Sequence, residues 1–274
     1  MKCRLPILVA MLIVWAVVPG AEAEGLQSHS VVYDVKLAKG EKDAYVEGQS
    51  TFTLTKRCDG WSLGEILQIG VDKGTAAAGQ KKLSDKADRL EERLNALESL
   101  DGRTLTYQTR LHLNARITTA TGKVTVGPEG GKLAADLGRY KQDSDLPAGT
   151  LLPAAARATL LNALIANKPG QIDVRTVEMM RFHKPITQAF IPLPPQDLAI
   201  DRDLPKDMHA SDKDFAKGRT WALLRRVTDN NEFGDELWLI HETGAIVRQI
   251  IRRQGVKLLL EAREITLFPA PTCP

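Results

Sequence analysis

The sequence predicts a mainly β protein in which antiparallel strands follow one another as a meander, with one or two short helices. Two observations favour this fold class. Apolar residues alternate with polar ones in many short segments, which is the period of a half-buried strand. These segments are separated by short turns rich in Gly, Asn and Asp. No strand–helix–strand repeat of the length that a parallel sheet requires is evident in the sequence.

The composition is that of an ordinary globular protein, since the 274 residues are 43% hydrophobic and 26% charged. This balance argues against wholesale disorder and against a chain that crosses a membrane several times. The formal net charge of +3 is small for the length, so we expect no nucleic-acid partner. The length suffices for a substantial core, and we expect one β-rich domain over residues 24–274.

The first three expected strands span 31–37, 45–56 and 61–71. Each alternates between apolar and polar positions, and in the third strand Glu65 alone interrupts the apolar face. Between the second and third strands, Cys58-Asp59-Gly60-Trp61 predicts a tight structural turn made by Asp59, Gly60 and Trp61. The Asp-Gly pair suits the positive φ that such turns need.

A change of period then predicts a helix at about 82–94. Apolar residues step by four and three positions, as on one face of an amphipathic helix, at Leu83, Ala87, Leu90, Leu94 and Leu97. Asp101-Gly102 follows and indicates the turn of a hairpin over about 95–114. We interpret the leucine stripe as a face that packs on the sheet, because the repeat is too short for a partner-binding coiled coil.

The middle of the chain predicts both strands and the clearest helix. The expected elements are strands at 117–126, 132–141, 172–177 and 186–192 and a helix at 151–167. Pro153 fits the first turn of this helix, where its missing N–H costs little. Pro169-Gly170 ends the helix.

The last part of the chain predicts a long connection followed by a meander. Residues 192–218 carry several prolines and mixed charges, and we expect a solvated excursion rather than a mobile flap. Four strands with short turns between them are then expected at 221–228, 236–242, 246–253 and 256–267.

Residues 1–23 have the features of a secretory signal peptide. A basic start precedes an uncharged run at 5–18, and Ala21-Glu22-Ala23 matches an A-x-A cleavage site. The run is shorter than the roughly 20 residues of a membrane-spanning helix, so cleavage is favoured over an uncleaved anchor. We expect an exported mature chain that begins near Glu24 and has no transmembrane anchor.

Two cysteines, Cys58 and Cys273, remain after cleavage, because Cys3 leaves with the signal. In an oxidising compartment they permit one intramolecular disulfide, which would join an early turn to the tail. Redox catalysis is the alternative, but the C-x-x-C motif that usually accompanies it is absent from the sequence. A zinc site would need further ligands at close spacing.

Five segments taken together resemble the DUF1849 family of periplasmic cell-envelope integrity proteins. They are HSVVYDV at 29–35, CDGW at 58–61, ESLDGR at 98–103, LPAGTLLP at 146–153 and PTC at 271–273. The resemblance implies a β-spiral, that is, a curled antiparallel sheet forming a half-barrel similar to the periplasmic lipoprotein carriers. It also implies a Cys58–Cys273 disulfide, a periplasmic location and a binding role without established chemistry.

One catalytic alternative comes from Gly60-Trp61-Ser62-Leu63-Gly64, which matches the G-x-S-x-G pattern of serine hydrolases. Such an enzyme would place Ser62 on a strand-to-helix turn, whereas the following residues alternate as a strand. His183, His209 and His241 are possible bases, but nothing in the sequence selects one. The scattered histidines indicate no metal site, and we expect no cofactor.

Non-catalytic binding is therefore the main functional hypothesis, with a protein partner or a lipid-like ligand. A curled sheet covered by a helix forms a concavity, and we expect apolar side chains to line it, with few polar groups among them. The candidate residues are Trp221, Trp238, Leu160 and Leu164. Arg252, Arg253 and Lys257 form a small basic cluster, which we interpret as a solvated strand edge rather than a lipid-headgroup site.

Overall fold

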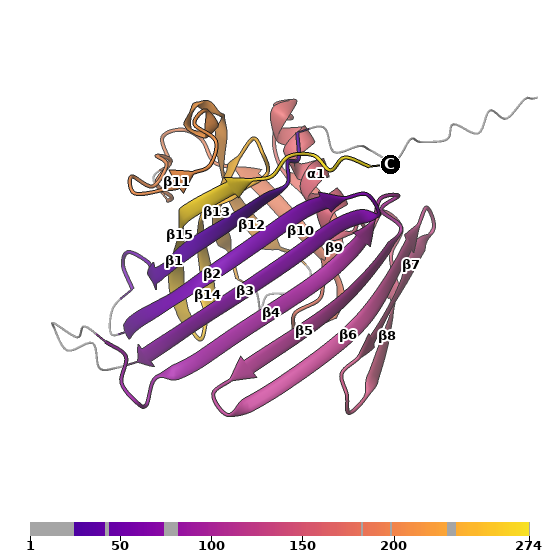
Figure 1. Cartoon of the computed structure of the whole chain (residues 1–274), viewed down its shortest axis with the longest axis horizontal. Coiled ribbons are helices and arrows are strands. Elements are labelled where there is room, and N and C mark those ends of the chain that lie inside the picture. The colour runs from indigo at the N-terminus through magenta and orange to yellow at the C-terminus, as the bar shows by residue number, and fades with distance from the viewer. Residues whose placement is uncertain are drawn as a thin grey trace, which may run out of the picture.

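In a computed structural model, the described residues are 25–41, 44–73, 82–181, 183–197, 199–228 and 234–273. The expected signal peptide at 1–23 lies outside them. All described strands belong to one 15-stranded sheet, and one α-helix, α1 (Pro153–Ile165), packs within its curve (Figure 1). None of the helices in the described part of the chain is long and apolar enough to cross a membrane.

The strands follow one another along the chain with few interruptions. They are β1 (His29–Leu37), β2 (Ala44–Arg57), β3 (Gly60–Lys73), β4 (Asp88–Ser99), β5 (Thr104–Leu113), β6 (Arg116–Gly127), β7 (Gly130–Asp136), β8 (Lys141–Leu146), β9 (Ile172–Glu178), β10 (Lys184–Pro192), β11 (His209–Ala210), β12 (Thr220–Val227), β13 (Glu236–His241), β14 (Ile246–Arg253) and β15 (Val256–Leu267). A short 3₁₀ helix spans Phe215–Lys217.

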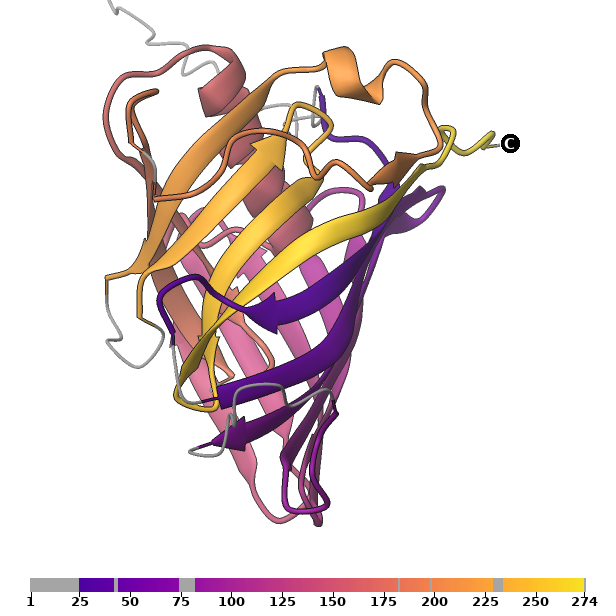
Figure 2. The same cartoon turned by 90° about the vertical axis from the view of Figure 1, so that its left-hand side faces the viewer.

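Two antiparallel meanders make up the sheet, whose order is β8-β7-β6-β5-β4-β3-β2-β1-β15-β14-β13-β12-β10-β9. The pairing of β1 with β15 joins the two meanders. The sheet curls strongly (Figure 2), so that Gln142 of β8 donates a hydrogen bond to the carbonyl of His183, just before β10, at 3.0 Å. Since no described ladder pairs β8 with β9 or β10, the sheet is curled but not closed. The expected fold class is confirmed.

The alternation in β1 shows how the sequence forms this sheet. Val31, Tyr33 and Val35 point inward and are at most 3% exposed, while the residues between them are half-buried. The Tyr33 hydroxyl donates a hydrogen bond to the carbonyl of Ile246 on β14 at 2.6 Å. A buried hydroxyl therefore has its partner, and the interior of the two meanders is connected through it.

The expected helix at 151–167 is confirmed as α1, and a carboxylate from the sheet caps its start. Pro153 opens the helix, and Leu152 at the N-cap offers no side-chain acceptor. Glu98 of β4 instead accepts hydrogen bonds from the backbone N–H groups of Ala154, at 2.8 Å, and Ala155, at 3.2 Å. This contact satisfies two of the free donors at the helix N-terminus and fixes α1 to the sheet.

The buried carboxyl of Glu98 is expected to make the free energy of unfolding depend on pH. Burial raises the pKa of its carboxyl to about 7, against an unfolded value near 4.5, although the helix N–H groups act in the opposite direction. The folded state therefore binds more protons between these two pH values, so this group's contribution to stability is lost as the pH rises from 4.5 to 7. The full loss is on the order of 3 kcal/mol. Urea unfolding of wild type and Glu98→Gln at both pH values measures it.

The control for this experiment is Glu47→Gln, because Glu47 is an exposed glutamate of β2. We expect the difference in unfolding free energy between wild type and Glu98→Gln to fall with rising pH, and that between wild type and Glu47→Gln to stay level. A wild-type advantage over Glu98→Gln that grows between pH 4.5 and 7 would contradict the assignment.

The helix expected at 82–94 is wrong, because residues 88–99 form strand β4. Its inward positions are every second residue, and Glu92 and Glu98 occupy two of them. Because these two inward positions carry glutamates, the sequence does not show the apolar–polar alternation of a strand. Leu97, which belongs to the expected helical stripe, points outward and is 38% exposed. The hairpin expected at 95–114 has its turn between β4 and β5.

Two further expectations need correction. The strand expected at 132–141 is divided between β7 and β8 by a turn at Gly138, whose φ is +78°. The connection at 192–218 is not a simple solvated excursion, because Ile200 and Phe215 are each 2% exposed and β11 pairs with β15. Arg248 of β14 also donates hydrogen bonds to backbone carbonyls of this connection.

The turn at 58–61 joins β2 to β3 and holds the C-terminal tail. Cys58 forms a disulfide with Cys273, and their Cα atoms are 5.5 Å apart. Gly60 follows Asp59 where the chain touches β4, because an added Cβ would lie 1.9 Å from the carbonyl oxygen of Glu98. Trp61 is buried in the core. The turn therefore needs glycine at this position for close approach of two backbones.

Candidate functional site

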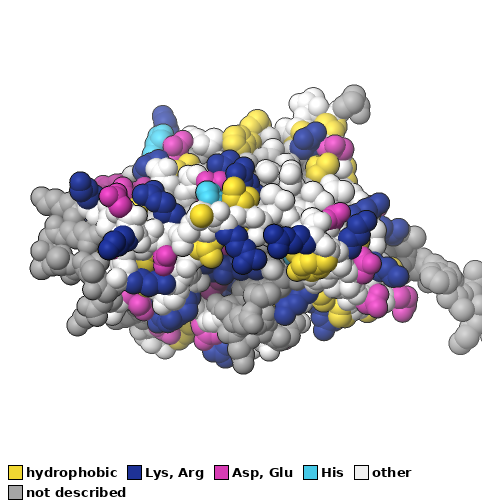
Figure 3. All heavy atoms as spheres, turned by 90° about the horizontal axis from the view of Figure 1, so that it is seen from below, with side chains coloured by type: hydrophobic (Ala, Val, Ile, Leu, Met, Phe, Trp, Pro, Cys, Tyr) yellow, Lys and Arg dark blue, Asp and Glu magenta, His cyan; other side chains and the backbone are white. Residues whose placement is uncertain are grey.

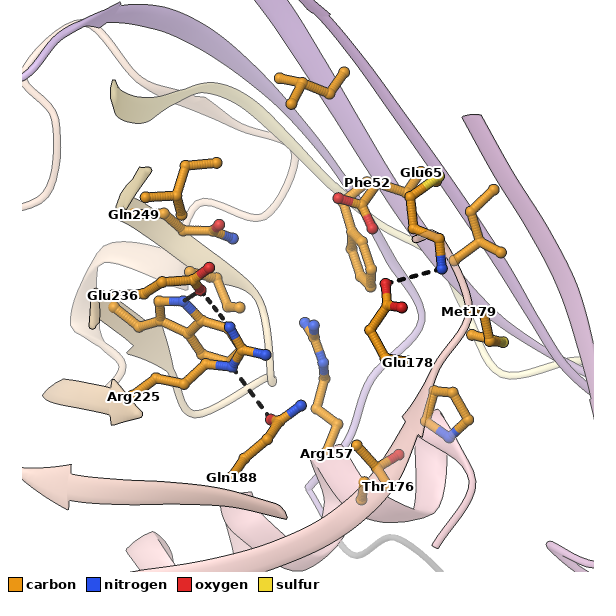
Figure 4. Close-up of a pocket in the computed structure, with 18 of the residues that line it drawn as sticks. Phe52, Glu65, Arg157, Thr176, Glu178, Met179, Gln188, Arg225, Glu236 and Gln249 are labelled. Carbon is orange, nitrogen blue, oxygen red and sulfur yellow. Dashed lines mark hydrogen bonds and ion pairs between the residues drawn. The ribbon is translucent and has the colours of Figure 1, made fainter. Parts of the chain in front are cut away.

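A cavity of about 270 Å³ lies between the inner face of the sheet and α1. It is lined by β3 and β4 on one side, by β12, β13 and β14 on the other, and by the helix (Figure 4). Apolar lining residues include Phe52, Leu63, Leu67, Leu160, Phe190 and Trp238. The volume is slightly below the range of about 300–1,000 Å³ that is usual for small-molecule sites.

The expectation that few polar groups line the concavity is wrong, because nine charged residues line this cavity together with the apolar ones. They are Arg157, Arg181, Arg225, Arg252 and Arg253 with Glu65, Glu92, Glu178 and Glu236. Most come from inward-facing positions of the strands. Isolated charges would be costly inside a protein, so the charges that are paired can be tolerated there.

Arg225 and Glu236 form the most buried ion pair of this lining. Their side chains are 10% and 5% exposed, and Arg225 Nη1 lies 2.6 Å from Glu236 Oε2. Gln188 accepts a hydrogen bond from Arg225 Nε at 3.3 Å, and Trp238 Nε1 donates to Glu236 at 3.2 Å. The dashed contacts in Figure 4 show this cluster on β10, β12 and β13. It holds the ring of Trp238 beside the cavity.

Arg253 connects the two sides of the curled sheet. Its guanidinium nitrogens lie 3.6 Å from Glu92 of β4 and 3.8 Å from Glu236 of β13. Glu92 also accepts a hydrogen bond from Arg181, which follows β9. Burial disfavours the charged form of Arg253, but Glu92, Glu236 and Glu65 together outweigh this and raise its pKa. The guanidinium is therefore held by charges that β4 and β13 bring together.

Arg157 differs from these arginines, because no described carboxylate lies within ion-pair distance of it. It projects from α1 into the cavity (Figure 4). Its guanidinium lies 4.4 Å from the centre of the Phe52 ring, and Nη1 donates to the carbonyl of Gly244 at 3.2 Å. Burial lowers the pKa of Arg157, which reflects the cost of keeping a charge at this depth.

Glu65 is the acidic group on the β3 wall of the cavity. Burial raises the pKa of its carboxyl, and the neighbouring Glu92 raises it further, while Arg253 and Arg157 act in the opposite direction. The same residue interrupts the apolar face of its strand in the sequence. Its position is therefore readable from the sequence, although its surroundings are not.

The structure brings together two of the four residues expected to line the concavity. Leu160 and Trp238 line the cavity. Leu164, also on α1, is buried in the apolar cluster that contains Leu160, and Trp221 packs against this cluster. Arg219 lies 5.3 Å from the ring of Trp221. The expected basic cluster is also divided. Arg253 is half-buried in the cavity lining, whereas Lys257 and Arg252 are exposed, although Arg252 also lines the cavity.

Ser62 lies within strand β3, not on the strand-to-helix turn where a serine hydrolase of this pattern would place it. It lies opposite Thr55 and Leu97, on the outer face of the sheet, whereas the cavity is on the inner face. His183 contacts Tyr107 at 3.0 Å, and His241 contacts Thr243 and the carbonyl of Phe215. His209 lies on β11. In the described ranges, no group of three possible metal ligands is present.

The sequence reasoning missed the interior charges on β4, β12 and β13. One signal could have found part of them: Glu92 and Glu98 stand an even number of positions from Leu90, Leu94 and Ala96 on the same strand. A strand reading of 88–99 would therefore have placed both glutamates inside. The sequence contains no comparable signal for the charged residues of the other meander, because they approach β4 only when the sheet curls.

The fold and the site define a class of protein: a curled, β-barrel-like antiparallel sheet with one helix and a charged internal cavity. A family model described as EipB-like matches residues 20–168, and the chain belongs to this family. The chain is similar to the crystal structure of a beta-barrel-like protein of domain of unknown function DUF1849 from Brucella abortus. The TM-score is 0.70 at 13% identity, over 89% of this chain and 99% of that chain.

This identity is low, so the structural likeness shows the shared fold. No curated protein matches the sequence. The resemblance to DUF1849 read from the sequence motifs is confirmed.

Proposed function

We propose that this protein is an exported, non-enzymatic binding protein of the periplasm that supports the cell envelope by holding a lipid-like ligand in its internal cavity. The single observation that carries the proposal is the cavity of about 270 Å³ that is lined by both meanders and α1. Its walls combine apolar side chains with fixed charges, which suits a ligand with an apolar chain and a polar head.

A protein partner on the outer surface is the other form of the binding hypothesis. Figure 3 shows the molecule from below, where Lys and Arg are prominent and hydrophobic side chains appear in small groups. A large exposed apolar patch would have favoured a protein-docking surface on this face. The cavity lined by both meanders and α1 supports the ligand form of the hypothesis, and a protein captured without any ligand would count against the proposal.

The test expresses the full chain, isolates the mature protein from the periplasmic fraction and identifies co-purifying molecules by native mass spectrometry. We expect a processed N-terminus near Glu24 and one bound amphiphile. Retention of the chain in the cytoplasm would contradict export, and a protein without ligand after exposure to membrane lipids would contradict the carrier role.

Filling the cavity gives a matched pair of variants on one helix. Ala156 lines the cavity, so Ala156→Leu places a larger side chain into it. Thr159 is exposed on α1, so Thr159→Leu adds comparable bulk outside. We expect Ala156→Leu to lower ligand occupancy at least fivefold and Thr159→Leu to leave it near the wild-type value. Equal occupancy in two folded variants would show that the ligand lies elsewhere.

A further inference from the structure

We infer that the cavity selects an amphiphile with a single apolar chain and an anionic head, and that Arg157 binds this head. The head is a carboxylate or a phosphate monoester. This inference rests on the proposed function. The inference names a ligand class and the residue that recognises it. It starts from the unequal pairing of the arginines that line the cavity.

Three cavity arginines already have carboxylate partners. Arg225 pairs with Glu236, Arg253 lies between Glu92 and Glu236, and Arg181 pairs with Glu92. Arg157 has neutral contacts in the described chain, namely the Gly244 carbonyl and the Phe52 ring. Arg252 also contacts only a carbonyl, that of Gly255, but it is exposed. Among the described lining arginines that are not exposed, Arg157 is therefore the one without a carboxylate at ion-pair distance.

The geometry of Arg157 leaves room for an anion. A guanidinium has five N–H donors, and Arg157 Nη1 donates one hydrogen bond to the carbonyl of Gly244. The Phe52 ring covers one face of the guanidinium at 4.4 Å, and Arg157 lines the cavity, so its remaining in-plane donors are available to a ligand there. Figure 4 shows the guanidinium between Phe52 and the Arg225–Glu236 pair. Carboxylate and phosphate oxygens match such a planar fork of donors.

The same surroundings argue against a cationic head. An ammonium group in the cavity would meet Arg157 in a water-poor interior, where like charges repel strongly. Glu92 and Glu236 are engaged with arginines, and Glu178 accepts hydrogen bonds from the backbone N–H groups of Met180 and Arg181. The raised pKa of Glu65 favours its neutral form, which can donate a hydrogen bond to an anion. Leu63, Leu67 and Leu160 provide apolar surface for one chain beside this position.

The experiment measures binding of four decyl probes to the mature protein by calorimetry: decanoate, decyl phosphate, decyltrimethylammonium and decanol. We expect decanoate and decyl phosphate to bind at least tenfold more tightly than the other two, since a charge-assisted hydrogen bond supplies a preference of this size. The two anions also distinguish a carboxylate from a phosphate source. In Arg157→Gln we expect the preference for anions to disappear while decanol binding is retained.

The control is Arg226→Gln, since Arg226 is an exposed residue of β12 paired with Asp235 outside the cavity. If Arg157→Gln fails to fold, Arg157→Lys replaces it, and we expect that variant to keep the anion preference at reduced affinity. Equal binding of all four probes, or an anion preference that survives in Arg157→Gln, would overturn the inference. The proposed function would stand in that case, because the cavity would still bind a ligand. Absence of binding by every probe would overturn the proposed function as well.

Discussion

Replacing Cys58 by serine is expected to lower the free energy of unfolding by up to about 5 kcal/mol. The disulfide links residues 215 positions apart, and a cross-link over so long a loop removes much conformational freedom from the unfolded chain. It also holds a tail that has left the sheet, since β15 ends at Leu267. Urea unfolding of oxidised wild type and of Cys58→Ser measures the difference.

Reduction provides the matched control. Dithiothreitol should destabilise the wild type to the level of Cys58→Ser and should leave Cys58→Ser unchanged. Cys273→Ser should behave as Cys58→Ser does, because either substitution removes the same bond. Titratable thiols in the folded, oxidised protein, or equal unfolding midpoints with and without reductant, would contradict a structural disulfide in the mature chain.

Arg225→Met is expected to destabilise the protein by roughly 3 kcal/mol, because it leaves Glu236 buried without its closest cation. The two side chains are 10% and 5% exposed and their charged atoms are 2.6 Å apart. The neighbouring residue gives a matched control. Arg226 pairs with Asp235 at 2.7 Å, but both side chains are about half exposed, and water screens such a pair. We expect Arg226→Met to change stability little.

The double variant Arg225→Met with Glu236→Leu separates the pair from the packing around it. Removing both charges should restore a large part of the stability lost in Arg225→Met, because no unpaired carboxylate remains in the interior. Chemical denaturation of wild type, Arg225→Met, Glu236→Leu and the double variant completes this double-mutant cycle. Similar losses in Arg225→Met and Arg226→Met would show that Glu236 is more hydrated than its 5% exposure indicates.

Most strands could be predicted from the sequence because their inward positions are apolar and their turns contain Gly, Asn or Asp. In β1 and in β15 up to Ala262, buried apolar residues alternate regularly with more exposed ones. β4 could not be predicted in this way. Two of its inward positions carry glutamates, and what stabilises Glu92 there is Arg181 and Arg253, which lie far along the chain.

The candidate site was harder to predict than the fold for a related reason. Leu160 and Trp238 could be selected as large apolar residues on a helix and a strand, and both line the cavity. Arg157 lies within the helix expected at 151–167, and nothing in the local sequence indicates that Phe52 covers it at 4.4 Å. That contact arises because the sheet curls around α1, and curl depends on strand twist summed over many strands.

The location of a bound amphiphile can be measured directly by nuclear Overhauser effects between ¹³C-labelled decanoate and the mature protein. We predict contacts from the chain of decanoate to the rings of Phe52 and Trp238, which line the cavity from β2 and β13. Contacts confined to exposed aromatic residues such as Tyr140, which is 62% exposed, would contradict an internal binding site.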